Sequence, residues 1–249
     1  MKILIIIFLS FIMARTASYP HTDILNDSRS CGERPNLEYS IQSPSGHFII
    51  HYDMYYDDIN QYAYSVGVAA DSSRHVMVDV MGFRSEIDDD DGFYDIYIEQ
   101  LGNGSYGWNC LDSDNMGSSW IEIDDDYIGS GYSTSGEDAM KITVAHEFFH
   151  AIQRAYLSSN NKNKFFFELS SVWIEDIIYP DIDDYISFGQ LADYYFDDPE
   201  MDIDDYYGYG LGLYGHYLNF KFDDQVMQRI WDGLSNVNPN DDSHVIQAI

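Results

Sequence analysis

Apolar residues alternate with polar ones, or form short runs, in three segments of the chain, and each pattern predicts a β-strand. The segments are residues 46–52, which follow a Ser-Pro-Ser-Gly turn, residues 94–99 and residues 119–124. A glycine-rich stretch at residues 102–117 separates the last two strands, and we expect it to form a loop.

Apolar residues that recur every three or four positions predict amphipathic helices over residues 59–80, 141–157 and 165–178. The order strand, helix, strand, strand and then helices is typical of an α+β domain. We expect this domain to cover residues 39–249, after a polar arm or linker at residues 19–38. The last nine residues resemble the start of a helix without a stop signal, which suggests a fragment of a longer protein.

The N-terminus predicts export. Lys2, the apolar run from Ile3 to Met13 and the small residues Thr16 and Ser18 are typical of a secretory signal peptide, which we place at residues 1–18. The run is short for a bilayer-spanning helix, and no later segment approaches spanning length. We therefore expect a secreted protein without membrane contact after cleavage.

The composition adds a strong negative charge. The chain of 249 residues contains 43 Asp+Glu against 12 Lys+Arg, which gives a net charge of −31. Each phosphate contact would oppose this field, so we expect no nucleic-acid partner. Aromatic residues make up 16% of the chain, and this favours a packed domain over a disordered acidic chain.

Part of this charge lies in short acidic runs, at residues 88–91, 124–126, 181–184 and 202–205. We interpret these runs as a hydrated acidic surface, because charge runs are usually solvated. Calcium-binding loops (Ca²⁺) are the alternative. The nearest match to a calcium loop is residues 112–117, where Met116 stands at a position that needs an oxygen ligand.

The two cysteines, Cys31 and Cys110, predict one disulfide in an exported protein. The alternative is a pro-segment around Cys31 whose thiolate blocks a metal ion. That arrangement would leave Cys110 unpaired in an oxidising compartment, so we favour the disulfide.

The candidate chemistry lies in the predicted helix at residues 141–157, which contains the sequence His-Glu-Phe-Phe-His at residues 146–150. Four residues are about one helical turn, so His146 and His150 project from one face and can bind one metal ion. Glu147 lies beside them, where it could take a proton from a water that zinc has acidified toward a pKa of about 7. The pattern predicts a catalytic zinc site with Glu147 as the general base.

A catalytic zinc ion (Zn²⁺) needs a third protein ligand and one open position. Seventeen residues separate His150 from Glu168, which leaves room for a helix end, a turn and a second helix. Glu175 lies two helical turns further on the same face, where a carboxylate can hold the far nitrogen of a ligand histidine. Solvent exposure is the alternative for Glu175, and Glu175 is the next candidate ligand after Glu168.

The sequence HEFFH followed by FFFELSSVWIED resembles the gluzincin metallopeptidases, and more widely a family of exported, little-characterised bacterial metalloproteases. The similarity covers roughly residues 45–232, through segments such as GHFIIHYD, YDIYIEQLG and WIEIDDDY. It implies a zincin-like fold, with a mixed sheet packed on the metal-binding helix and a mainly helical C-terminal half. It also implies His146, His150 and Glu168 as zinc ligands and Glu147 as the general base.

The chain departs from the family in two places. Leu169 follows the third ligand where many gluzincins have glycine. The Gly-x-Met-Glu-Asn element of the gluzincin aminopeptidases is absent, so the resemblance does not support recognition of a free N-terminus.

Peptide hydrolysis also needs a donor that stabilises the oxyanion and protonates the leaving amine. Gluzincins of the aminopeptidase type carry Tyr-x-x-Gly after the third ligand, and residues 209–212 match this pattern. Tyr209 is therefore the first choice for the donor, and Tyr207 and His216 are the alternates.

Together these features predict a secreted zinc metallopeptidase that acts on peptides or proteins. We expect an extended substrate to pair with an edge strand, and residues 118–124 are the expected edge. Two alternatives stay open: a non-catalytic binding protein with calcium-holding acidic loops, and a zinc hydrolase of another amide or ester. The intact Glu147 argues against the first alternative, since a non-catalytic site needs no base.

Overall fold

The computed structural model of the chain describes residues 31–102, 104–112, 117–129, 131–157, 164–187, 200, 203 and 208–236. At its centre lies a five-stranded mixed sheet with the strand order β1-β2-β3-β5-β4. The strands are β1 (Tyr39–Gln42), β2 (Phe48–Tyr52), β3 (Tyr94–Glu99), β4 (Gly107–Leu111) and β5 (Ser119–Asp124). β2, β3 and β5 run parallel, and β1 and β4 join antiparallel at the two edges.

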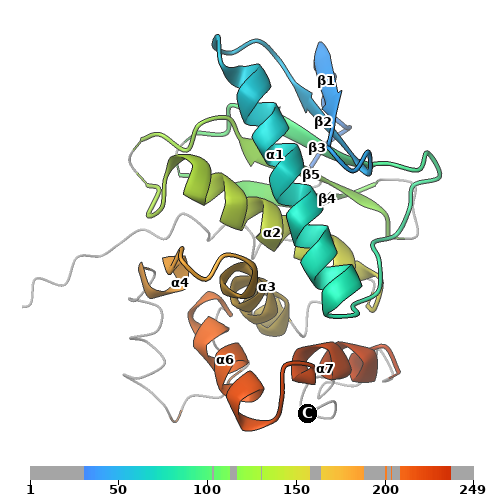
Figure 1. Cartoon of the computed structure of the whole chain (residues 1–249), viewed down its shortest axis with the longest axis vertical. Coiled ribbons are helices and arrows are strands. Elements are labelled where there is room, and N and C mark those ends of the chain that lie inside the picture. Colours follow the sequence, from blue (N-terminus) through green and yellow to red (C-terminus); the bar gives the residue numbers. More distant parts are fainter. Residues whose placement is uncertain are drawn as a thin grey trace, which may run out of the picture.

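The helices lie beside the sheet and beyond it. α1 (Ile59–Arg74) continues into the π-helical η2 (His75–Val80), and α2 (Gly136–Arg154) carries the His-Glu-Phe-Phe-His sequence. The C-terminal half consists of α3 (Lys164–Ile178), α4 (Asp184–Ser187), η5 (Tyr209–Leu211), α6 (Gly212–Lys221) and α7 (Val226–Leu234). Figure 1 shows α3, α6 and α7 at the end of the molecule away from the sheet.

This architecture confirms the predicted α+β class. The strands at residues 94–99 and 119–124 form where the alternation predicts them, and α1 with η2 covers the helix predicted at residues 59–80. The sheet is mixed, as expected, and it packs on α2. A closer likeness to the zincins stays a prediction.

Two predictions about the sheet are wrong. β4 lies within residues 102–117, where the glycines favour a loop. Residues 118–124 are not an edge either, because β5 pairs with β3 on one side and with β4 on the other. β4 can form and pair with β5 because Gly107 lets the two backbones approach closely. A Cβ at Gly107 would lie 2.7 Å from the main-chain oxygen of Glu122.

The main core lies between the sheet and the helices. Figure 1 shows α1 and α2 on one face of the sheet, where strand residues Phe48, Ile96 and Ile123 are fully buried. Phe148 of α2 packs edge-on against Phe48, with ring centroids 5.1 Å apart. α3 packs against another side of α2, so α2 is enclosed and its polar side chains are buried with its apolar ones.

The other face of the sheet is covered in part by the arm at residues 31–38. Trp120 alternates with the core residues of β5 and packs there with Cys31 and Cys110. A disulfide joins Cys31 to Cys110 and confirms the predicted pairing. It rules out the alternative in which a free Cys31 thiolate blocks a metal ion.

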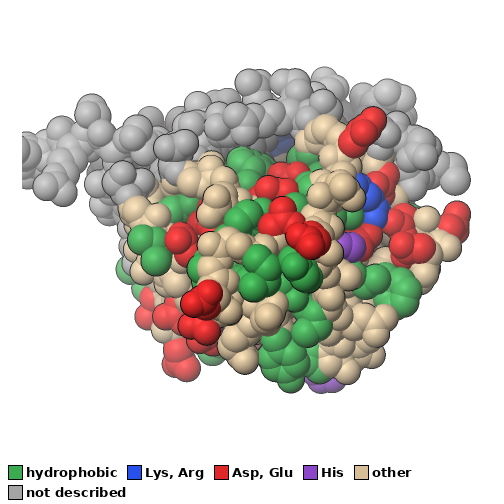
Figure 2. All heavy atoms as spheres, turned by 90° about the horizontal axis from the view of Figure 1, so that it is seen from above, with side chains coloured by type: hydrophobic (Ala, Val, Ile, Leu, Met, Phe, Trp, Pro, Cys, Tyr) green, Lys and Arg blue, Asp and Glu red, His purple; other side chains and the backbone are tan. Residues whose placement is uncertain are grey.

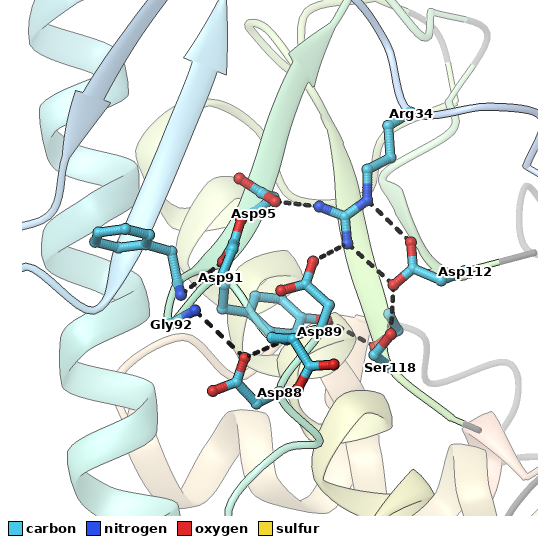
Figure 3. A network of polar contacts seen from close by, with 12 residues as sticks. Arg34, Asp88, Asp89, Asp91, Gly92, Asp95, Asp112 and Ser118 are labelled. Carbon is cyan, nitrogen blue, oxygen red and sulfur yellow. Dashed lines mark hydrogen bonds and ion pairs between the residues drawn. The ribbon is translucent and has the colours of Figure 1, made fainter. Parts of the chain in front are cut away.

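Arg34 ties this arm to the sheet. Its guanidinium binds Asp112 through two hydrogen bonds, of 2.9 Å from Nε and 3.0 Å from Nη2, and it also contacts Asp89 and Asp95 (Figure 3). Burial disfavours the charge of Arg34, but Asp112 and the other two carboxylates outweigh burial and raise its pKa. The arm is thereby held to β3 and to the end of β4.

The face seen in Figure 2 carries several groups of acidic side chains and few basic ones. Within the part of the chain that the structure describes, every helix is too short or too polar to span a bilayer. The predicted signal peptide at residues 1–18 and the last nine residues lie outside the described residues.

Candidate metal centre

Two helices bring the predicted site residues together. His146, Glu147 and His150 lie on α2, and Glu168 lies on α3. All four residues are buried, with exposed fractions between 3% and 8%. The four-residue spacing on α2 places the two imidazoles on one face, with ring centroids 4.8 Å apart. Ionisable groups buried this deeply cost free energy unless they are paired or bind a metal ion.

The potential ligand atoms converge. Those of His146, His150 and Glu168 all lie within 4.8 Å of one another. Glu168 Oε2 is 3.2 Å from His146 Nε2 and 3.6 Å from His150 Nε2. Two ligand atoms at about 2.1 Å from a tetrahedral ion would lie about 3.4 Å apart. The separations therefore fit a site in which these three residues hold one metal ion.

The Nδ1 atoms of both imidazoles form hydrogen bonds with other side chains. His146 Nδ1 lies 2.5 Å from Glu175 Oε1, and His150 Nδ1 lies 2.8 Å from Gln153 Oε1. Each acceptor favours the tautomer that carries hydrogen on Nδ1 and leaves the Nε2 lone pair for a metal. Glu175 is 8% exposed, so the alternative that it faces solvent is wrong.

His150 Nε2 shows that the site fits a metal ion. This nitrogen is buried, and it has no hydrogen-bond partner among the described residues. A buried lone pair without a partner costs free energy unless a ligand occupies it, and a metal ion facing Glu168 would do so. Burial lowers the pKa of His146, but Glu168 and Glu175 outweigh burial and raise it. A proton therefore competes with the metal for this imidazole.

Glu147 lies in the same buried region. Burial raises the pKa of its carboxyl group above the usual value, which makes the carboxylate a stronger base. Its main-chain oxygen accepts a 3.1 Å hydrogen bond from Asn109 Nδ2. Arg154 Nε donates a 2.7 Å hydrogen bond to Asn109 Oδ1. β4 is thereby attached to the turn of α2 that carries Glu147.

Tyr209 lies against the centre. Its ring stacks on the ring of His146, with centroids 5.9 Å apart and planes 6° apart. Burial and the charge of Glu168 raise the pKa of its hydroxyl well above the usual value, so the hydroxyl stays protonated and can donate. Gly208 permits this placement, because its φ is 81° and a Cβ there would lie 2.3 Å from Phe165 O.

The structure describes one of the two alternative donors, His216. His216 Nε2 lies 3.1 Å from Asp176 Oδ2, and its ring lies 5.4 Å from that of Tyr185. Tyr207 lies outside the described residues. Of the two described candidates, Tyr209 is the one that contacts a candidate ligand, and its role as a donor stays a prediction.

Two of the four acidic runs accept hydrogen bonds from main-chain N–H groups. Residues 88–91 are exposed or half-buried, as a hydrated surface predicts, whereas Asp124, Asp125 and Asp184 are buried, so that interpretation is wrong for these three residues. Asp88 and Asp91 accept hydrogen bonds from nearby N–H groups (Figure 3). Asp124 accepts 2.9 Å and 2.8 Å hydrogen bonds from the N–H groups of Gly102 and Tyr127. These bonds explain the carboxylates as turn-forming groups. Both runs group three carboxylates closely, but calcium binding there stays a prediction.

The sequence reasoning missed two residues that support the centre. Gln153 is fully buried, and its amide nitrogen donates to Phe167 O at 2.9 Å, which fixes the side chain that binds His150. It follows His150 by three positions on the same helix face, so helical spacing could have identified it. Asn109 lies in the stretch that was predicted to be a loop, and no local pattern points to it.

A scan against models of known protein families finds no match to this chain, and a comparison with curated proteins finds none either. A fold can carry many functions, so an α+β architecture does not supply the answer. The case for a function therefore rests on the geometry of the site.

Proposed function

We propose that this protein is a secreted zinc metallopeptidase of the gluzincin type, which acts on peptides or proteins. The observation that carries the proposal is the convergence of His146, His150 and Glu168, with Glu175 and Gln153 on the far nitrogens. Two imidazoles and one carboxylate are a ligand set that suits zinc, and three protein ligands leave a fourth position open.

The residues around the metal ligands have distinct roles in this proposal. When bound, a zinc ion would supply Lewis acidity and lower the pKa of a water toward about 7. Glu147 would take a proton from that water and deliver it to the leaving amine. The Tyr209 hydroxyl would donate a hydrogen bond to the oxyanion as it develops.

β4 is the proposed place for an extended substrate. It packs against α2, and among the described strands it pairs only with β5. Asn109 of β4 binds the main chain of Glu147, so this edge lies beside the proposed base. Main-chain pairing with an open sheet edge is a common way to hold a peptide. β4 thus replaces residues 118–124 as the expected substrate edge.

The proposed location outside the cell has support from the disulfide. The Cys31–Cys110 bond fits an oxidising compartment, because thiols in the cytosol are kept reduced. The signal-peptide pattern at residues 1–18 predicts the same destination.

The test is the digestion of a broad peptide library by the zinc-loaded protein and by Glu147→Gln. We expect Glu147→Gln to keep its zinc and to lose turnover by about a hundred- to ten-thousandfold, because the base is removed and the ligands are not. Glu137→Gln is the matched control, since Glu137 is an exposed carboxylate on the same helix. It should leave both zinc and turnover unchanged.

Equal cleavage by the wild type and Glu147→Gln would exclude the proposed mechanism. Stoichiometric zinc without cleavage of any peptide would instead favour a binding protein or a hydrolase of another amide or ester.

A further inference from the structure

A small cavity adjoins the candidate metal centre. Its volume is about 30 Å³, which is room for about two water molecules. Three carboxyl groups line it, those of Glu147, Glu175 and Asp184, together with the aliphatic side chains of Ile142 and Val172. The cavity therefore combines negative charge with apolar walls at the place where a substrate would meet the metal.

Asp184 has no role in the mechanism proposed above. It is the first residue of α4, it is 4% exposed, and its carboxylate accepts a hydrogen bond from the hydroxyl of Thr134. Burial raises its pKa to about 6, so it is largely ionised at neutral pH. Among the described residues, His146 is the one positive group that acts on it. A buried carboxylate of this kind is stabilised by a cationic partner.

The metal itself does not supply this partner. Glu168 is the one carboxylate among the three residues that would hold a divalent ion, Asp184 is not one of them, and Glu175 is engaged by His146. The carboxylate of Asp184 would then remain without a compensating charge beside the cavity.

A buried hydroxyl group also lies in the cavity wall. Thr143 is 3% exposed, and its hydroxyl oxygen has no hydrogen-bond partner among the described residues. The buried hydroxyl of Tyr127 lies close to it, since a side-chain interaction with Thr143 acts to lower the pKa of Tyr127. A hydroxyl oxygen has two acceptor lone pairs, so Thr143 can face Tyr127 and still accept a hydrogen bond from a ligand in the cavity.

We propose that this cavity binds a primary ammonium group of the substrate, from a lysine side chain or a free amino terminus, with Asp184 as the residue that determines specificity. The inference rests on the proposed peptidase function and names the substrate class for that site. An ammonium group is compact and has three N–H donors, which suit Asp184 and the Thr143 hydroxyl. The donors of a planar guanidinium are fixed in one plane, whereas those of an ammonium can turn to reach a carboxylate and a hydroxyl on two separate residues of the wall.

The apolar walls and the charge of the whole chain agree with this assignment. Ile142 and Val172 can contact the methylene groups that precede an ammonium, as aliphatic surface commonly does for lysine. Tyr106 and Tyr209 place aromatic rings in the same wall, and such rings attract cations. The net charge of −31 favours the approach of cationic substrates.

The test is a calorimetric measurement of peptide binding to zinc-loaded Glu147→Gln, which does not depend on turnover. The probes are acetylated, amidated pentapeptides of alanine with lysine, arginine or norleucine at the centre, and the norleucine peptide with a free amino terminus. We expect the lysine peptide or the free-amine peptide to bind at least about tenfold more tightly than acetylated norleucine peptide. Which of the two gains affinity identifies the source of the ammonium.

Asp184→Asn in the same background should reduce this preference to about twofold or less, because it removes the charge and keeps the shape. Asp183→Asn is the matched control, since Asp183 is the exposed neighbour, and it should keep the full preference. Thermal melting shows whether each variant is folded. The lysine and norleucine peptides are compared without any substitution at Asp184, so this comparison tests the proposal even if Asp184→Asn does not fold.

Four results would overturn the assignment: no detectable peptide binding, equal affinities for the ammonium and neutral peptides, a preference that survives Asp184→Asn, or arginine bound as tightly as lysine. These outcomes can be distinguished from a failure of the peptidase proposal. An ammonium preference without any cleavage by the wild type would reject only the peptidase, and cleavage without the preference would reject only the cavity assignment.

Discussion

Two groups of ionisable side chains converge in this molecule, and they are completed in different ways. On the arm side of the sheet, Asp89, Asp95 and Asp112 converge on the guanidinium of Arg34 (Figure 3). Between α2 and α3, Glu168 converges with two imidazoles, and no lysine or arginine of the described residues pairs with it. The first group has a cation supplied by the chain itself, Arg34, whereas the second is suited to an ion from outside.

This difference shows how a candidate metal site can be recognised among the acidic clusters of a strongly acidic chain. Carboxylates that already accept bonds from an arginine or from main-chain N–H groups, such as Asp88 and Asp112, are satisfied. His150 Nε2 is buried and has no hydrogen-bond partner among the described residues. Asp89 Oδ1 is also buried without a hydrogen-bond partner, but the same carboxylate pairs with Arg34. The candidate metal centre is distinguished by buried imidazole and carboxylate ligand atoms that converge without a lysine or arginine among the described residues.

After Glu147→Gln, Tyr209→Phe should have the largest effect on catalysis by a residue that does not bind the metal. Loss of a hydrogen bond made mainly in the transition state should lower kcat by about a hundred- to a thousandfold, with little change in KM. Zinc content should not change. Steady-state kinetics on one cleaved peptide would check this, with Tyr217→Phe as the control, since Tyr217 is half exposed on α6. A normal kcat in Tyr209→Phe would transfer the role to another donor.

Glu175→Gln should weaken metal binding, because Glu175 holds His146 Nδ1 at 2.5 Å. Loss of such an outer partner typically costs about ten- to a hundredfold in metal affinity. Competition with a chromogenic zinc chelator would measure it. Asp176→Asn, which removes the neighbouring carboxylate on α3, should leave the affinity unchanged. Equal affinities in the two variants would show that Glu175 does not support the ligand.

Arg34→Met should destabilise the fold without affecting the metal. Three carboxylates would lose their shared cation, and we expect a cost of about 1–3 kcal/mol in the free energy of unfolding, because the group is partly exposed. Arg74→Met is the control: Arg74 is similarly exposed but bonds to one carboxylate, Glu86. Urea unfolding would compare them. A larger loss in Arg74→Met, or a loss of zinc in Arg34→Met, would contradict this separation of roles.

Much of the candidate metal centre could be predicted from the sequence because its residues lie on two helices. Helical spacing fixes the relation of His146 to His150, and of Glu168 to Glu175, before any tertiary contact is known. The strands at residues 94–99 and 119–124 could be predicted for the same reason, since alternation is a local signal.

The rest depends on contacts between segments far apart in the chain. Arg34 and Asp112 are 78 residues apart, and Asn109 and Glu147 are 38 apart, so no local pattern links either pair. β4 was missed because Gly107, which normally disfavours a strand, is needed here for the close approach of β5. Local periodicity predicts elements, whereas edges and networks follow from how those elements pack.

The metal content of the purified protein tests the central claim most directly. After loading with zinc and dialysis, elemental mass spectrometry should find about one zinc per wild-type chain, as three buried ligands predict. His146→Ala, His150→Ala and Glu168→Ala should each retain almost none. A wild-type chain without stoichiometric zinc would contradict the account, and full zinc in Glu168→Ala would reject Glu168 as the third ligand.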